Sequence, residues 1–114
     1  MENRCLLKVA FCVFLFSSAI GNALTIKQAE EKANQVCAAC HGKDGVNGVL
    51  PSYPIIAGQY SDYLNQALMD YKSGARKNAV MGGIAATLTK EEMSGLARYF
   101  ASLPTPLNDK NRKD

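Results

Sequence analysis

Apolar residues recur at intervals of three and four along three stretches of the chain, and each stretch predicts an amphipathic helix. The first stretch covers residues 26–36, with Thr25 in front of it as a candidate N-cap. The helix is expected to run directly into residues 37–41, which places the cysteines of that segment in its last turn.

The second predicted helix begins at Tyr60 or Ser61 and ends at Ser73, where Gly74 supplies the residue type that commonly follows a helix. Its apolar side chains form a broad stripe, made of Tyr60, Tyr63, Leu64, Ala67, Leu68 and Tyr71.

The last predicted helix has the clearest start signal. Thr89 and Glu92 have the spacing of a capping box, in which the threonine caps the helix and the glutamate reaches back three residues later. Apolar residues follow at helical spacing, namely Met93, Leu96, Ala97 and Phe100. We expect this helix to end at Leu103, because Pro104 cannot continue it.

The segments between these helices are rich in glycine and proline. Residues 42–48 hold three glycines and predict tight turns. These glycines either serve the turns alone or let the backbone pass close to a bound group. Residues 51–59 contain two prolines, which keep the backbone extended. Because no strand-like alternation and no internal repeat is present, the pattern predicts an all-α domain.

The first 23 residues have the pattern of a cleaved signal peptide. Arg4 and Lys8 precede an apolar run over residues 9–20, and Gly21 to Ala23 supply small residues where a signal peptidase cuts. The run is shorter than the roughly 20 residues that span a bilayer, so export and cleavage are predicted. The predicted organisation is a signal peptide (1–23), one domain (24–103) and a flexible polar tail (104–114).

Cleavage of this leader changes the cysteine count, because two of the four cysteines leave with it. The mature chain then has no spare pair for a disulfide, although it enters an oxidising compartment. The leader also removes two basic residues and one acidic residue, so the mature chain stays close to neutral. Strong attraction to nucleic acid or to a membrane surface is not indicated, and no nucleic-acid motif is present.

The two remaining cysteines stand in a Cys-x-x-Cys-His run, Cys37, Cys40 and His41, the attachment signature of a c-type haem. Residues three and four positions apart share a face of a helix, so both thiols and the imidazole point the same way. A thioredoxin-like redox pair would need a preceding strand, and a structural zinc site would need a fourth ligand. Neither is present in the mature sequence. We expect the haem to form the centre of the core and the haem-free chain to fold poorly.

The second axial ligand must come from another residue type, because His41 is the only histidine. Methionine is the usual alternative and raises the reduction potential. Met69 and Met93 lie in predicted helices, where methionine more often fills a core. Met81 lies in a segment expected to be non-helical, from which its sulfur would reach the iron. We therefore predict Met81 as the ligand.

The chain resembles a small single-haem class I cytochrome c, similar to one half of the bacterial di-haem cytochromes c. The matching stretches are residues 37–42, 53–59, 74–76, Asn78 with Met81, and 96–100. The resemblance implies three to four helices around one covalently attached haem, with the first and last helices crossing. It also implies that the carbonyl of Pro54 accepts a hydrogen bond from His41 and orients the imidazole.

A haem iron bound by histidine and methionine has no open position, which predicts a periplasmic one-electron carrier rather than an enzyme. Redox partner proteins would dock transiently on a monomer. Four basic residues are present in this part of the chain, namely Lys43, Lys72, Arg76 and Lys77. They are more simply interpreted as ordinary solvent-exposed charges than as a basic rim that binds an acidic partner. Two alternatives stay open: the electron-accepting subunit of a flavin-linked sulfide or small-molecule dehydrogenase, and a gas-binding haem protein with a labile Met81.

Overall fold

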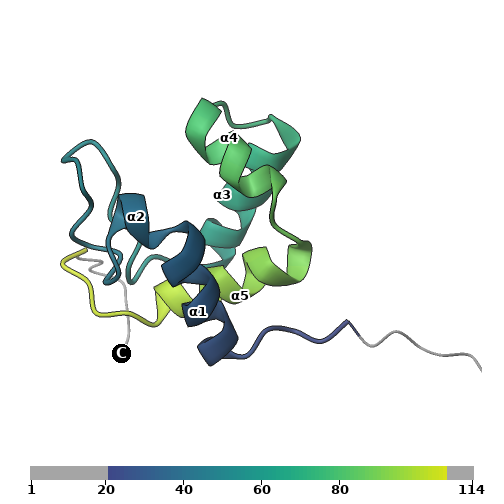
Figure 1. The fold of residues 1–114 in the computed structure, drawn as a ribbon, viewed down its shortest axis with the longest axis horizontal. Coiled ribbons are helices and arrows are strands. Elements are labelled where there is room, and N and C mark those ends of the chain that lie inside the picture. Colours follow the sequence, from purple (N-terminus) through teal and green to yellow (C-terminus); the bar gives the residue numbers. More distant parts are fainter. Residues whose placement is uncertain (1–20, 108–114) are drawn as a thin grey trace, which may run out of the picture.

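The computed structural model describes residues 21–107, which form helices joined by loops (Figure 1). Over this range the helices are α1 (Ile26–Val36), α2 (Ala38–His41), α3 (Ser61–Ser73), α4 (Ala79–Ala86) and α5 (Lys90–Ala101). The predicted all-α fold is confirmed, with no strand among these residues. More helices form than the expected three to four, because α2 is a separate turn and α4 occupies a segment predicted to lack a helix.

Helices α1 and α5 pack against each other through small residues. Ala29 of α1 is fully buried, and a Cβ atom added to Gly95 of α5 would lie 3.5 Å from the Cβ of Ala29. The same atom would lie only 2.9 Å from the Cβ of Leu24, so Leu24 covers Gly95 just before α1 begins. Arg98 of α5 also donates a hydrogen bond of 2.8 Å to the carbonyl oxygen of Leu24. The residues ahead of α1 are thus attached to the last helix.

Capping boxes start both of these helices. The hydroxyl of Thr89 accepts from the N–H of Glu92 at 3.1 Å, and the Glu92 carboxylate accepts from the N–H of Thr89 at 2.9 Å, which confirms the predicted start of α5. Thr25 caps α1 as predicted, and Gln28 completes a second capping box that the sequence analysis missed. Glu92 also pairs with Lys32 of α1 at 2.9 Å. One carboxylate therefore both caps α5 and ties it to α1.

Helix α3 has the predicted bounds and packs on α4 and α5. It ends at Ser73, and Gly74 follows with a φ of 84°, a conformation that glycine adopts without strain. None of its residues is fully buried, despite the broad apolar stripe. Leu64 and Leu68 are only partly buried where they contact the core. The stripe faces a cavity instead of a packed interior.

Helix α4 corrects the prediction that the segment around Met81 is non-helical. Asn78 has an extended backbone, and its side-chain oxygen accepts a hydrogen bond of 2.9 Å from the N–H of Met81. This bond is an N-cap, and it starts the helix at Ala79. Gly82 and Gly83 resemble a loop in the sequence, yet neither has a positive φ, and both continue the helix. Figure 1 shows α4 beside α3, against which it packs.

The glycine-rich loop after α2 folds into turns that contact protein atoms. Gly45 has a φ of 66°, and a Cβ atom there would lie 3.0 Å from the Phe100 ring and 3.2 Å from the Cβ of Ala57. Asp44 accepts hydrogen bonds of 2.9 Å from the N–H groups of Val46 and Asn47, and these bonds hold the pKa of its carboxyl below the ordinary value. The turns that the sequence predicts are therefore present.

The two ends of the chain lie largely outside the described residues. The predicted signal peptide covers residues 1–23, of which only 21–23 are described, and the predicted tail continues through 108–114 beyond the described range. Helix α5 ends at Ala101, two residues before the predicted Leu103. The chain tightens there, because the N–H groups of Ser102 and Leu103 donate to carbonyls three residues back, those of Tyr99 and Phe100. Between residues 21 and 107, no helix is long and apolar enough to cross a membrane.

Candidate functional site

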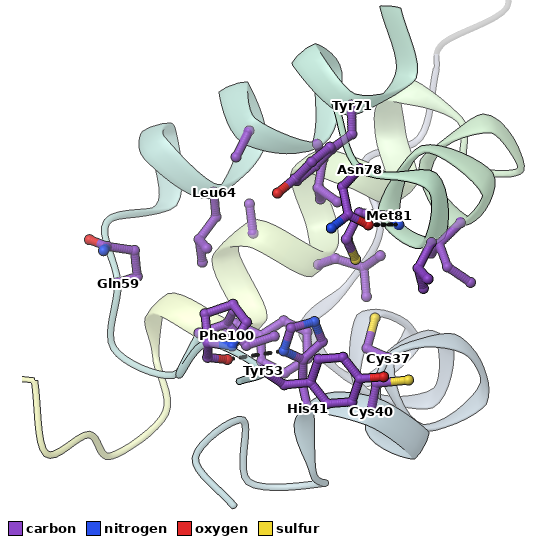
Figure 2. Close-up of a pocket in the computed structure, with 18 of the residues that line it drawn as sticks. Cys37, Cys40, His41, Tyr53, Gln59, Leu64, Tyr71, Asn78, Met81 and Phe100 are labelled. Carbon is purple, nitrogen blue, oxygen red and sulfur yellow. Dashed lines mark hydrogen bonds between the residues drawn. The ribbon is translucent and has the colours of Figure 1, made fainter. Parts of the chain in front are cut away.

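A cavity of about 490 Å³ lies between α2, α3, α4 and α5 (Figure 2). Its volume falls within the range of roughly 300–1,000 Å³ that is typical of ligand sites. The walls are mostly aliphatic and aromatic. The lining residues are Val36, Cys37, Cys40, His41, Ser52, Tyr53, Pro54, Ile55, Ile56, Gln59, Tyr63, Leu64, Ala67, Leu68, Tyr71, Arg76, Asn78, Val80, Met81, Ile84, Leu88, Leu96, Ala97 and Phe100.

The Cys-x-x-Cys-His segment forms one wall of this cavity. Helix α1 ends at Val36, so the cysteines do not lie in its last turn as predicted; Cys37 instead precedes the separate turn α2. Cys37, Cys40 and His41 nevertheless keep helical spacing, because the N–H of His41 donates to the carbonyl of Cys37 at 3.0 Å. Both thiols are free and half-buried, and Figure 2 shows them beside the imidazole. The segment therefore presents the expected three side chains together.

The thiol of Cys37 is held in its protonated form. Burial against the core raises its pKa to about 11, although the nearby Lys32 acts in the opposite direction. Thioredoxin-like redox cysteines need a lowered pKa, because the thiolate is the nucleophile. The environment of Cys37 is the reverse of that arrangement.

His41 is almost fully buried, with 8% of its surface exposed, and its ring is fixed by a backbone contact. Its Nδ1 lies 3.0 Å from the carbonyl oxygen of Pro54, the contact that the resemblance implies. Because a carbonyl oxygen only accepts, Nδ1 carries the proton and Nε2 keeps its lone pair. Tyr53 lies beside the imidazole, with ring centroids 6.1 Å apart. The imidazole is thus in the tautomer in which Nε2 can bind a metal.

Met81 lies on the opposite wall, and Figure 2 shows its sulfur directed into the cavity toward the His41 side. The N-cap bond from Asn78 fixes its backbone at the start of α4. The other two methionines of the described chain do not line the cavity: Met93 is 1% exposed within the core, and Met69 is 37% exposed on α3. Of the three candidates in residues 21–107, Met81 alone faces His41.

The sequence analysis missed most of the wall formed by α4 and the segment after it. Val80, Ile84 and Leu88 line the cavity at intervals of four residues, a helical period that was hidden by the two glycines between them. Asn78 also contributes as the helix cap, a role for which asparagine is a preferred residue type.

The donor set fits a c-type haem. The cavity would receive the macrocycle between apolar walls. Two thiols lie on one wall, and an imidazole and a thioether face each other across the cavity. Haem iron in cytochromes c takes these two ligand types.

Comparison with known proteins gives a consistent result. The cytochrome c family model matches residues 26–104 of this chain. Cytochrome c4 of Thiocapsa roseopersicina is 45% identical over 75 residues, which cover 66% of this chain and 38% of the relative. The cytochrome subunit of sulfide dehydrogenase of Chlorobaculum tepidum is 44% identical over 68 residues, which cover 59% of each chain. The structure of Acidithiobacillus ferrooxidans cytochrome c4 matches with a TM-score of 0.64 and 32% identity, covering 68% of this chain and 49% of that chain.

The chain spans less than two thirds of the length of each of these relatives. This partial coverage agrees with the predicted resemblance to one half of a di-haem cytochrome. Because the family model covers most of the described residues, the chain belongs to the cytochrome c family, whose domain carries a covalently bound c-type haem.

Proposed function

We propose that this protein is a one-electron carrier in which Cys37 and Cys40 attach one haem and His41 and Met81 bind its iron from opposite sides. The observation that carries the proposal is the pair of opposed side chains, the imidazole and the thioether, across an apolar cavity beside two free thiols. When bound, the haem supplies reversible one-electron chemistry at its iron.

The surrounding residues favour electron transfer over chemistry on a substrate. His41 and Met81 together would occupy both axial positions, which leaves no coordination site for oxygen or another small molecule. The walls of the cavity are mostly apolar, and a thioether ligand would stabilise ferrous iron and raise the reduction potential. The hydrogen bond to Pro54 holds the imidazole in position, and the Asn78 cap holds the backbone of Met81.

The proposed setting is the periplasm, on the basis of the predicted leader over residues 1–23 and of the bacterial relatives. The protein would act as a monomer that docks redox partners transiently. An interface smaller than about 1,200 Å² suits this role, because a shuttle must also dissociate.

The test is an absorption spectrum and an intact mass of protein exported from a bacterium that attaches haem. We expect a covalent haem adduct and the low-spin spectrum of a histidine–methionine iron. A colourless protein with two free thiols in its mature form would refute the proposal.

A second candidate function is favoured by one of the relatives. The cytochrome subunit of sulfide dehydrogenase from Chlorobaculum tepidum is 44% identical over the matched region. The chain would then accept electrons inside a stable complex with a flavin-linked dehydrogenase. Co-purification of the native protein with a flavoprotein, at constant stoichiometry through size-exclusion chromatography, would favour this function over a free shuttle.

A further inference from the structure

The chain after α5 returns to the loop that holds the imidazole of His41. Figure 1 shows this segment, beyond Ala101, turning back beside the loops that precede α3. Thr105 lies directly against Gly58 there, because a Cβ atom added to Gly58 would overlap with the Cβ and Cγ2 atoms of Thr105. Gly58 also has a φ of 68°, which glycine adopts without strain. The side chain of Thr105 therefore occupies the space that a side chain at position 58 would need.

Backbone hydrogen bonds attach the same loop to the core from two other sides. The N–H of Gly58 donates to the carbonyl of Phe100 at 2.8 Å. The N–H of Ala57, a fully buried residue, donates to the carbonyl of Gly45 at 3.1 Å. The contact with Thr105, in contrast, is made by a side chain. A substitution at Thr105 can therefore remove this contact and leave the two backbone bonds in place.

The loop carries the carbonyl that orients the imidazole. The carbonyl oxygen of Pro54 lies 3.0 Å from Nδ1 of His41. Pro54 itself is exposed, so burial contributes little to fixing its carbonyl, and the position of that carbonyl depends on where the chain is attached on either side. Before it, the N–H of Tyr53 donates to the carbonyl of Leu50 at 3.0 Å, and after it the loop is attached through residues 56–58.

We propose that Thr105 is a positioning residue for His41: its methyl group fixes the loop at Gly58, and the loop holds the Pro54 carbonyl on the imidazole. The inference rests on the proposed function, in which His41 binds the haem iron. A hydrogen bond donated by the second ring nitrogen fixes the orientation of a metal-bound imidazole and raises its basicity. The segment after α5 thus acts on an iron ligand, although none of its described residues lines the cavity.

The side-chain atoms of Thr105 make different contacts, which allows the proposal to be tested by single substitutions. Cγ2 is the atom closest to a Cβ added at Gly58, whereas Oγ1 is 3.1 Å from it and accepts a hydrogen bond of 3.0 Å from the N–H of Leu107. Thr105→Ser keeps the hydroxyl and deletes the methyl group that lies against Gly58. Thr105→Val keeps a methyl group at this place and deletes the hydroxyl.

The experiment measures how fast the Nδ1 proton of His41 exchanges with solvent, by NMR of the exported holoprotein. Local opening of the loop breaks the bond to Pro54 and releases this proton. We expect about fourfold faster exchange in Thr105→Ser, the ratio that corresponds to the loss of one buried methyl group. Thr105→Val should exchange close to the wild-type rate. Leu107→Ala is the matched control in the same segment, since Leu107 is 39% exposed, and it should also exchange as the wild type does.

The outcomes separate this inference from the proposed function. If Thr105→Ser lowers the melting temperature but leaves the Nδ1 proton of His41 exchanging at the wild-type rate, Thr105 serves only the stability of the fold and the inference is overturned. Equally fast exchange in Thr105→Ser and Thr105→Val would assign the effect away from the methyl group and would also overturn it. The proposed function stands in both cases if the wild type shows the histidine–methionine spectrum. A wild type without covalent haem would refute the proposed function, and this inference with it, whatever the exchange rates.

Discussion

At the scale of single residues, the site depends on His41 and Met81, and a hydrogen bond to a neighbouring residue fixes the position of each. The Pro54 carbonyl forces the proton of His41 onto Nδ1, and the Asn78 side chain fixes Met81 by its backbone N–H. The attachment motif could be predicted from the sequence because its spacing is local. Met81 lines the cavity and Met69 does not, which agrees with the predicted choice of ligand. The helix that presents Met81 was not predicted, because Gly82 and Gly83 hid it.

Replacement of Met81 by alanine tests the ligand assignment. Met81→Ala should lower the reduction potential and open an iron position, so that carbon monoxide added to the reduced protein gives a large spectral change at neutral pH. Met69→Ala is the matched control, because Met69 lies on the surface of α3 outside the cavity. Equal spectra and potentials in the two variants would exclude Met81 as the ligand.

Two glycines should respond in opposite ways to the same substitution. Gly83 lies inside α4 with a non-positive φ and with no atom within 4 Å of an added Cβ, so Gly83→Ala should stabilise the protein by about 0.5–1 kcal/mol. Gly45 has a positive φ and lies against Phe100, so Gly45→Ala should destabilise it. Chemical denaturation of the two holoprotein variants measures both effects. A loss of stability in Gly83→Ala would show that α4 is packed more closely than the structure indicates.

At the scale of elements, α5 could be predicted because its signals are local: a capping box, helical spacing and a following proline. The start of α1 could be predicted from Thr25 and the helical spacing, whereas its end at Val36 carries no local signal. The apolar stripe of α3 could be predicted from the sequence. That it faces the cavity could not, because only the fold decides whether Leu64 and Leu68 contact protein atoms or a cofactor. The α1–α5 contact likewise depends on Gly95 and Leu24, which are far apart in the sequence and carry no local signal.

The cap of α5 should carry a measurable share of the stability. Thr89→Ala removes the acceptor for the N–H of Glu92 and should cost about 0.5–2 kcal/mol in the free energy of unfolding. Thr87→Ala is a suitable comparison, because its hydroxyl bonds only to the carbonyl of Ile84 within the preceding turn. Denaturant titration of the two holoproteins should show the larger loss for Thr89→Ala.

Glu92 should give the α1–α5 contact a pH dependence. Lys32, followed by the N–H of Thr89, lowers the pKa of Glu92 below its ordinary value of 4.5. A carboxyl whose pKa is lower in the folded state stabilises the fold above its unfolded pKa, and this stability is lost as the pH falls through the folded pKa. Glu92→Gln should therefore lower the melting temperature at pH 7 and have a much smaller effect near pH 3. Glu91→Gln, one residue away and exposed, should show no such difference between the two pH values.

At the scale of the whole molecule, the cofactor completes a core that the side chains leave open. The buried core consists mainly of residues from α1, α5 and the segment before α5, while α3 contributes no fully buried residue. A chain of this size buries too little surface to keep an apolar cavity of about 490 Å³ without cost. This explains why composition and length predicted a haem-centred core before any contact was known.

Loss of the covalent attachment should consequently affect folding as well as colour. The double variant Cys37→Ser/Cys40→Ser, exported from the same host, should lack the haem adduct by mass. Its thermal unfolding, followed by circular dichroism, should lose the cooperative transition of the holoprotein. A cooperative transition at the wild-type temperature would mean that α1, α3 and α5 form a stable core without the cofactor.

The contact of Leu24 with Gly95 and Arg98 sets a boundary for protein engineering. A cytochrome module grafted into a host protein has to carry residue 24 along with the helices, although no helix begins until residue 26. A graft that starts at Ile26 would expose the surface of Gly95 that Leu24 covers, and Arg98 would lose the carbonyl to which it donates. The shortest unit that can be transplanted therefore includes the non-helical residues 24 and 25, which a definition of the module by its helices would leave out.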